Sequence, residues 1–304
     1  MQPMNSLDSL DLIYALAASG AAMLLGVWFA KKQADAFQGE SHNGYPAVTF
    51  SDYGDMRFLH LGSPAVQGSM RLSQPLEIHL EYVQRMMAWL LFVDLDQVGN
   101  LKAMQLGLGA ASLTKFCHAR LGMHTTAVEW NPQVIDTCRT SFHLPPNSAR
   151  LNVVQGDAAD IAQHSEWQGQ IDVLHVDLYD GDAQCPVLDT EAFYRDCRQL
   201  LTATGCMVVN VFGQTSNATE SIQKIMAVFG MQAVWSFKPT TAGNVIVLAF
   251  CAPLHEDKRD LTSQAQAIEK RWSLNTAAWL NALAPVRLPL RHWQNQRLLK
   301  KVTL

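Results

Sequence analysis

The segment 171–182, IDVLHVDLYDGD, runs from apolar residues into three carboxylates, those of Asp177, Asp180 and Asp182. Carboxylates are costly to bury without a partner, so a strand that ends in several of them suggests a chemical role. One carboxylate can hold an ammonium group while another accepts a proton from an attacking nitrogen, and this pairing suits a cationic amine. The structural alternative is a turn around Gly181, with Asp177 as a capping group.

Three earlier apolar runs also end in residues that suit a nucleoside. The first leads into Gly107 and Gly109 in LGLGAAS, where small residues let the backbone approach a ligand beside a helix N-terminus. Glu129 follows Gly109 by twenty residues, a spacing typical of an acceptor for two ribose hydroxyls. Asp157, in QGDAAD, could accept from an adenine amine or cap the next helix, and the sequence leaves both open. Together these residues predict an adenosyl pocket.

The elements that would position these residues alternate between strand and helix patterns. Helix-length segments separate five apolar runs, at 103–107, 124–129, 151–155, 171–177 and 205–211. This rhythm predicts an α/β fold with a parallel, doubly wound sheet, whose ligands bind beyond the carboxyl ends of the strands.

Two later runs, 232–237 and 244–250, are separated only by a short turn and should form an antiparallel C-terminal hairpin. The combination is the plan of the class I S-adenosylmethionine-dependent, Rossmann-like fold.

The rest of the chain predicts smaller elements around this sheet. Alternating apolar residues predict an N-terminal β-meander, and residues 76–93 and 261–283 have helical spacing. The basic tail after them is most simply a solvated surface, with a contact to membrane phospholipid as the alternative. The expected segments are an apolar helix at 1–32, the meander at 47–75, the Rossmann-like domain at 76–253, and a C-terminal helix and tail at 254–304.

The N-terminal run at residues 12–30 is uncharged and is followed by Lys31 and Lys32. As a helix it would be about 28 Å long, close to the thickness of a bilayer core. The basic pair would then keep the remaining chain on the cytoplasmic side. The run is also rich in small residues, so a packed or oligomer-forming helix is an equal alternative. We expect a cytoplasmic protein, with an anchor at the inner face of a membrane as an open alternative.

The composition excludes several other classes of function. A net charge of −4 and a pI near 6.2 do not indicate a nucleic-acid partner. The six cysteines form no C-x-x-C pair, so the sequence predicts neither a zinc site nor a redox dithiol.

With these residues in place, the chain resembles the polyamine aminopropyltransferases, the spermidine and spermine synthase family, over roughly residues 47–250. The motifs that carry the resemblance are AVQGSMRL, LGLGAAS, AVEWNPQVID, GDAAD, and IDVLHVDLYDGD followed by LDTEAFYRDCRQLLTATGCMVVN. The last two segments are the most specific, because their residues and spacing match the family in more detail than the alternation of strands and helices requires.

The resemblance implies roles for individual residues. Asp177 would be the base on the attacking amine, and Asp180 and Tyr179 would bind substrate. Glu81 would be an acidic residue near the amine, and His79 stands where the family has a tyrosine in the polyamine groove. On the donor side the implied residues are Gln67 at the thioether, Gly107 and Gly109 in the glycine turn, Glu129 at the ribose and Asp157 at the adenine.

Three departures make the chain a divergent, spermidine-synthase-like member. Ala110 replaces a loop aspartate that helps to bind the donor's ammonium group, His79 replaces the groove tyrosine, and Gly181 replaces a proline. The charge-assisted contact that is lost with this aspartate would contribute about 1.5–3 kcal/mol to donor binding. His79 could tune amine binding or be an ordinary histidine, whereas His175 in the fourth run reads as a core histidine.

The resemblance implies aminopropyl transfer from decarboxylated S-adenosylmethionine to putrescine or a related polyamine, with release of methylthioadenosine. It further implies no metal and no tightly bound cofactor. The alternatives are a methyltransferase that uses intact S-adenosylmethionine, to which Ala110 would be less repulsive than an aspartate, and a non-catalytic nucleoside-binding homologue. Family members are commonly dimers or tetramers, so a homodimer is expected.

Overall fold

The computed structural model describes residues 44–179, 188–211, 215–254 and 261–287. Its strands are β1 (Val48–Tyr53), β2 (Met56–Leu61), β3 (Val66–Arg71), β4 (Lys102–Leu106), β5 (His124–Glu129), β6 (Leu151–Gln155), β7 (Ile171–Val176), β8 (Leu201–Val211), β9 (Val234–Phe237), β10 (Val245–Phe250) and β11 (Leu283–Pro285). Its α-helices are α3 (Glu81–Arg85), α4 (Ser112–Lys115), α5 (Pro132–Ser141), α6 (Ala158–Gln163), α7 (Glu191–Leu200), α8 (Thr215–Phe229), α9 (Leu261–Trp272) and α10 (Thr276–Leu280). Other helical segments include the 3₁₀ helix η1 (Ala88–Phe92) and the π-helix η3 (Phe116–Arg120).

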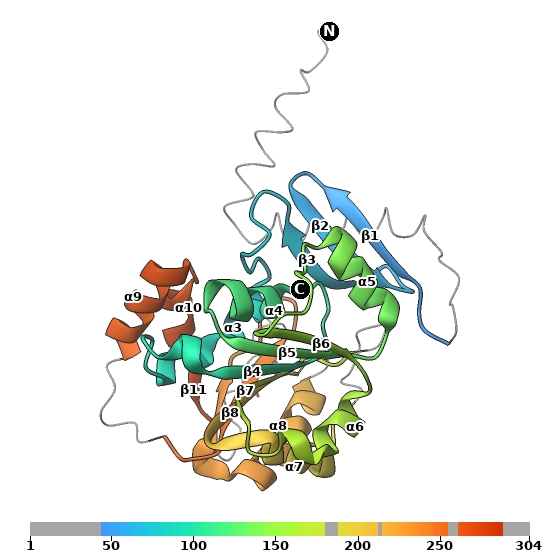
Figure 1. Ribbon diagram of the computed structural model, residues 1–304. Helices are drawn as coiled ribbons and strands as arrows, with labels where there is room; N and C mark the ends of the chain where they lie inside the picture. The colour runs from blue at the N-terminus through green and yellow to red at the C-terminus, as the bar shows by residue number, and fades with distance from the viewer. Residues whose placement is uncertain (1–43, 180–187, 212–214, 255–260, 288–304) are drawn as a thin grey trace, which may run out of the picture.

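The central sheet has eight strands in the order β11-β9-β10-β8-β7-β4-β5-β6 (Figure 1). Strands β4 to β8 pair in parallel, and β10 pairs antiparallel with both β8 and β9. The predicted fold, including its C-terminal hairpin, is confirmed. The strand order reverses between β4 and β7, so the ends of these two strands are where this fold places a ligand.

Helices cover the sheet on both faces. In Figure 1, α6, α7 and α8 lie below the sheet, whereas α3 and α4 lie above it. Successive residues of a strand alternate between the two cores, as the pleat requires. Ala103, Val173 and Val208 belong to one core, and Met104, Leu174 and Met207 belong to the other.

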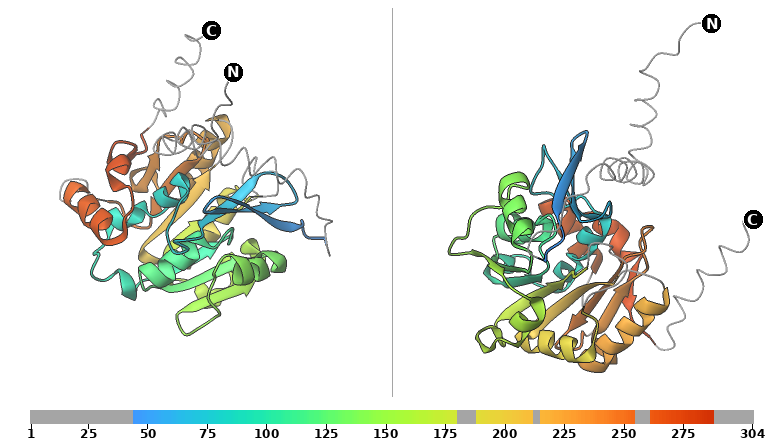
Figure 2. Two further views of the ribbon diagram at one scale, coloured as in Figure 1. Left: turned by 90° about the horizontal axis from the view of Figure 1, so that it is seen from above. Right: turned by 90° about the vertical axis from the view of Figure 1, so that its right-hand side faces the viewer.

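The N-terminal strands form a separate antiparallel sheet, β1-β2-β3, which confirms the predicted meander. Seen from above in Figure 2, this sheet and α9 lie at opposite sides of the molecule. The meander shares an apolar core with the glycine turn and α5, in which Leu59 and Met70 pack with Leu108 and Val134. It therefore covers the carboxyl end of β4 from one side.

Two predicted helices differ from the structure. The segment 76–93 forms only the short α3 and then η1, because all residues from Met86 to Phe92 are buried and leave no face for solvent. The segment 261–283 breaks after α9, where Ser273 adopts a left-handed conformation (φ 57°) and ends the helix. The chain then forms α10 and adds β11 to the edge strand β9, an eighth strand that the sequence pattern did not predict.

Several predictions concern residues outside the described ranges: the apolar run 12–30, Asp180 to Asp182, and most of the basic tail. Among the residues that the structure describes, no helix is long and apolar enough to cross a bilayer. The anchor, the cellular location and the four segment boundaries therefore stay predictions.

Candidate active site

The glycine turn after β4 meets the end of β7. Gly107 has φ +92°, and a Cβ on it would lie 2.2 Å from the carbonyl oxygen of Asp177. Only glycine can occupy this position, because any side chain would overlap the backbone of the neighbouring strand. The Asp177 amide in turn donates to the Leu106 carbonyl at 3.0 Å. The predicted glycine turn and the predicted base are thus in direct backbone contact.

Glu129 binds the same turn from the other side. Its side chain is 8% exposed, and its carboxylate accepts from the backbone amides of Leu108 at 3.1 Å and Asn131 at 2.9 Å. Burial raises the pKa of Glu129, and hydrogen bonds from these backbone amides oppose the rise. Glu129 therefore joins the ends of β4 and β5, at the place where the sequence predicts a ribose.

Strand β3 lies against the glycine turn and brings Gln67 to it. A Cβ on Gly109 would be 3.2 Å from the Gln67 carbonyl oxygen, and a Cβ on Gly68 would be 2.7 Å from the Cβ of Ala110. The Ser112 hydroxyl donates to the Ser69 carbonyl at 3.0 Å. Ala110, which by the resemblance replaces a loop aspartate, is 3% exposed and is covered by β3.

Asp157 is the N-cap of α6, where its Oδ1 accepts from the Ala159 amide at 2.7 Å. The capping interpretation of this residue is therefore confirmed. Its second carboxylate oxygen lies at the exposed end of β6, and its predicted contact with adenine stays a prediction.

Asp177 lies just beyond β7 and is held by two residues that the sequence reasoning did not single out. Its Oδ1 accepts from Asn210 Nδ2 at 2.8 Å, and the Tyr82 hydroxyl also hydrogen-bonds its carboxylate. Burial raises the pKa of Asp177, while these two hydrogen bonds oppose the rise. Asn210 could have been found as the polar residue within the apolar run MVVNV; Tyr82 gave no such signal.

Two further predicted substrate residues follow Asp177. The Tyr179 hydroxyl donates to the backbone carbonyl of Asn210 at 2.7 Å, so this ring is held against the end of β8. Asp180 lies outside the described residues.

His79 and Glu81 lie directly before Tyr82 in the chain. Arg71 and His79 line a cavity of about 120 Å³, where the Arg71 guanidinium is 3.4 Å from Nδ1 of His79. Burial and the Arg71 charge lower the pKa of His79, which keeps the ring neutral at pH 7. The Glu81 carboxylate pairs with Arg85, which also donates to the Lys238 carbonyl at 2.7 Å. These contacts do not test whether His79 and Glu81 bind substrate, so both roles stay predictions.

His175 is 1% exposed within β7, as expected of a core histidine. Burial lowers its pKa to about 4, so the ring is neutral.

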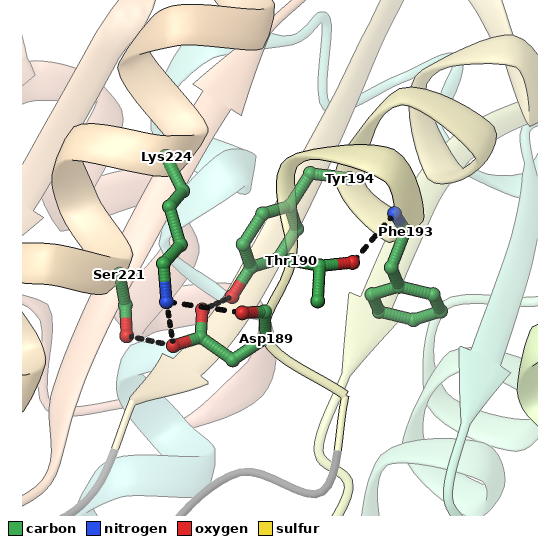
Figure 3. Close-up of polar contacts among 6 residues, drawn as sticks. All are labelled: Asp189, Thr190, Phe193, Tyr194, Ser221 and Lys224. Atoms are coloured by element: carbon green, nitrogen blue, oxygen red, sulfur yellow. Dashed lines mark hydrogen bonds and ion pairs between the residues drawn. The ribbon is translucent and has the colours of Figure 1, made fainter.

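A polar cluster anchors the chain where it enters α7 after the segment 180–187 (Figure 3). The Asp189 carboxylate accepts from the Tyr194 hydroxyl at 2.8 Å, from the Ser221 hydroxyl at 2.9 Å and from Lys224 Nζ at 2.9 Å. The cluster ties the start of α7 to α8. The sequence did not predict it, because the partners lie 5 to 35 residues from Asp189 along the chain.

The arrangement combines a half-buried carboxylate of raised pKa with a turn of small residues and a buried glutamate. Such a carboxylate can accept a proton, and the turn can approach a ligand closely through its backbone.

The chain matches no protein-family model. It is 34% identical over 236 residues to a polyamine aminopropyltransferase of Neisseria meningitidis, an alignment that covers 77% of this chain and 87% of that protein. It is 32% identical over 240 residues to a polyamine aminopropyltransferase of Chromobacterium violaceum, covering 78% and 89%. Among solved structures, it resembles a probable spermidine synthase from Corynebacterium glutamicum with a TM-score of 0.64 and 20% identity, covering 77% of this chain and 86% of that one.

Proposed function

The chain belongs to the polyamine aminopropyltransferase family, and on that premise we propose that it transfers an aminopropyl group from decarboxylated S-adenosylmethionine to putrescine or a related polyamine. The observation that carries the proposal is Asp177: a half-buried carboxylate of raised pKa, in backbone contact with the glycine turn. A general base works best when its pKa is close to the working pH, and burial moves Asp177 in that direction.

The chemistry requires little beyond positioning and one proton transfer. The acceptor nitrogen attacks the methylene carbon next to the sulfonium, a C–N bond forms and the C–S bond breaks. The bonding electrons neutralise the sulfonium, and methylthioadenosine leaves. Asp177 takes the proton that the nitrogen releases. Because the sulfonium is already a good leaving group, alignment and deprotonation of the amine supply most of the rate enhancement.

We place the donor across the glycine turn. Glu129 already accepts from the backbone amides of Leu108 and Asn131, and a backbone hydrogen bond from Trp130 also acts on it. An ionised carboxylate has about four acceptor sites, so it keeps acceptor capacity for the ribose. Asp157 has one oxygen that caps α6 and a second that can face the adenine amine. Gln67 reaches the turn through β3, near the expected position of the thioether.

We place the acceptor between Asp177 and the cavity at His79. Glu81 and Asp180 would hold its ammonium groups, and Tyr179 would line its path. The neutral His79 would contribute a polar surface rather than a charge. The other expected features, a homodimer and a membrane tether, remain predictions.

A direct assay tests the proposal. The purified protein is given putrescine and either decarboxylated or intact S-adenosylmethionine, and methylthioadenosine and S-adenosylhomocysteine are measured. We expect methylthioadenosine from the decarboxylated donor. Methyl transfer from intact S-adenosylmethionine, with no reaction of the decarboxylated donor, would establish the methyltransferase alternative instead.

Asp177→Asn tests the base. We expect kcat to fall by about 10²–10⁴, since general-base catalysis contributes on this scale, while donor binding measured by calorimetry persists. Asp136→Asn, on the exposed face of α5, is the matched control and should leave both quantities unchanged. Undiminished turnover by Asp177→Asn would remove the residue from the base role.

A further inference from the structure

We propose that Asn244, in the turn before β10, is a positioning residue that fixes the orientation of the Asn210 amide and so makes Asn210 an obligatory donor to Asp177. The inference rests on the proposed function in one respect, the role of Asp177 as base. The residues involved are Thr240, Asn244, Asn210 and Asp177, and we call them the amide chain.

The amide chain is continuous from the β9–β10 turn to the end of β7. The Thr240 hydroxyl is 3.4 Å from Asn244 Oδ1, and Asn244 Nδ2 donates to Asn210 Oδ1 at 3.1 Å. Asn210 Nδ2 then donates to Asp177 Oδ1 at 2.8 Å. The chain crosses three neighbouring strands at one end of the sheet, because Asn210 lies in β8, Asn244 directly precedes β10 and Asp177 directly follows β7.

The direction of the chain is set at Thr240. Its hydroxyl oxygen accepts from the backbone amide of Asn244 at 3.0 Å, so its own hydrogen is available for Asn244 Oδ1. The Asn244 side chain therefore turns its NH₂ group toward Asn210. Because Asn210 accepts on its oxygen, its NH₂ group faces the other way, toward Asp177. Every hydrogen bond along the chain donates in the direction of the carboxylate.

The opposite orientation of Asn210 would have a different chemical effect. Rotated by half a turn, its carbonyl oxygen would face Asp177 and favour a protonated acid, whereas an N–H donor favours the carboxylate. Asn210 is 4% exposed, and Asn244 and Thr240 are each 8% exposed. Water is therefore poorly placed to replace a missing partner, and an unmade bond carries its full penalty.

Among the described residues, Tyr82 is the other side chain that hydrogen-bonds the Asp177 carboxylate. From α3, the Tyr82 hydroxyl hydrogen-bonds the carboxylate, and Tyr179 from the following segment acts on Tyr82. Burial raises the pKa of Tyr82 well above its usual value, so it does not charge in the working range. Among the described residues, Asn210 is thus the donor to Asp177 whose orientation depends on the rest of the amide chain.

The test replaces Asn244 with leucine, which has a similar size and no donor. The readout is the pH dependence of kcat/KM. We expect kcat/KM to fall about tenfold on the acid limb and to return to within about twofold of wild type on the alkaline plateau, because the base is protonated to higher pH. An aspartate at this position can only accept from Asn210, so Asn244→Asp should shift the acid limb of the kcat/KM profile to still higher pH. An equal loss at all pH values would indicate a merely structural role and overturn the proposal.

Thr240 supplies a matched pair of variants. Thr240→Val removes the hydroxyl and should also shift the acid limb of the kcat/KM profile to higher pH. Thr240→Ser keeps the hydroxyl and should leave the profile unchanged. If Asn244→Leu fails to fold, this pair tests the proposal by itself; identical pH profiles for Thr240→Val and Thr240→Ser would contradict it.

A measurement that needs no turnover separates this proposal from the proposed function. The Asp177 carboxyl carbon is titrated by ¹³C NMR, with its signal assigned by Asp177→Asn. We expect a higher pKa in Asn244→Leu than in the wild-type protein. An unchanged titration would overturn the inference, and absence of aminopropyl transfer by the wild-type protein would overturn only the proposed function.

Discussion

The two sides of the site are built differently. The proposed donor side comprises Gln67, Gly107, Gly109 and Glu129. It is held by close backbone approaches at the two glycines and by hydrogen bonds from backbone amides to the Glu129 carboxylate. The proposed acceptor side comprises the side chains of His79, Glu81 and Asp180, and the two that are described interact with arginines. The donor side is therefore fixed by the fold, whereas the acceptor side can vary without disturbing it. We expect substitutions on the donor side to affect stability and catalysis together, and those on the acceptor side to affect acceptor binding alone.

The largest effect is expected for Gly107→Ala. The new Cβ would overlap the Asp177 carbonyl oxygen, 2.2 Å away, so one of the two backbones must move. We expect a loss of about 3–5 kcal/mol in the free energy of unfolding, measured by denaturant titration, and a fall of about 100-fold in kcat/KM because the base is displaced.

Gly122→Ala is the matched control for this substitution. Gly122 also has positive φ (+70°), but no atom lies within 4 Å of the added Cβ. Gly122→Ala should lower the free energy of unfolding by about 1–2 kcal/mol and leave kcat/KM unchanged. Equal effects of the two substitutions would show that the contact with Asp177 does not matter.

Glu129→Gln is expected to have the next largest effect. An amide NH₂ cannot accept a hydrogen bond, so either Leu108 or Asn131 would lose its acceptor in a buried place. We expect about 1–3 kcal/mol of destabilisation and donor binding weakened about tenfold or more by calorimetry. Glu220→Gln, at an exposed position of α8, is the control. Normal donor affinity in Glu129→Gln would contradict the ribose assignment.

Ala110→Asp tests whether the family's loop aspartate can be restored. Ala110 is buried beneath β3, so the new carboxylate would be desolvated against Gly68. We expect about 1–3 kcal/mol of destabilisation and no gain in donor affinity. Ala110→Asn has the same shape without the charge and separates the steric effect from the electrostatic one. Tighter donor binding by Ala110→Asp alone would show that the position faces the donor after all.

The smallest effect on stability is expected for Glu81→Gln. The Glu81 side chain is 51% exposed, and ion pairs of this kind contribute about 0–1 kcal/mol. Arg85 keeps its bond to the Lys238 carbonyl, so α3 should remain in place. We expect a rise of a few-fold in KM for the acceptor and none for the donor, with Glu269→Gln as the control. A change in donor KM would mean that the two sides are coupled.

Much of the donor side could be predicted because its residues occupy fixed places along the chain. Gly107, Glu129 and Asp157 each follow an apolar run, and a parallel sheet brings the carboxyl ends of such runs to one edge. The capping role of Asp157 could also be predicted, because a carboxylate before a helix is a usual N-cap.

The remaining features depend on contacts that periodicity does not encode. Tyr82 and Asn210 are 128 positions apart and converge on Asp177 only through the packing of α3 against the sheet. The segment 76–93 has the apolar content of a helix, but tertiary burial on all sides overrides that pattern. Strand β11 is three residues long and too short to leave a pattern.

That short strand has a consequence for association between molecules. A sheet edge with free N–H and C=O groups can recruit a strand from another chain. Here the edge ends in three residues, the last of which, Pro285, has no N–H to offer. Another molecule cannot extend the sheet at β11 over any useful length, so a dimer of this enzyme has to be built from side-chain surfaces or from another edge.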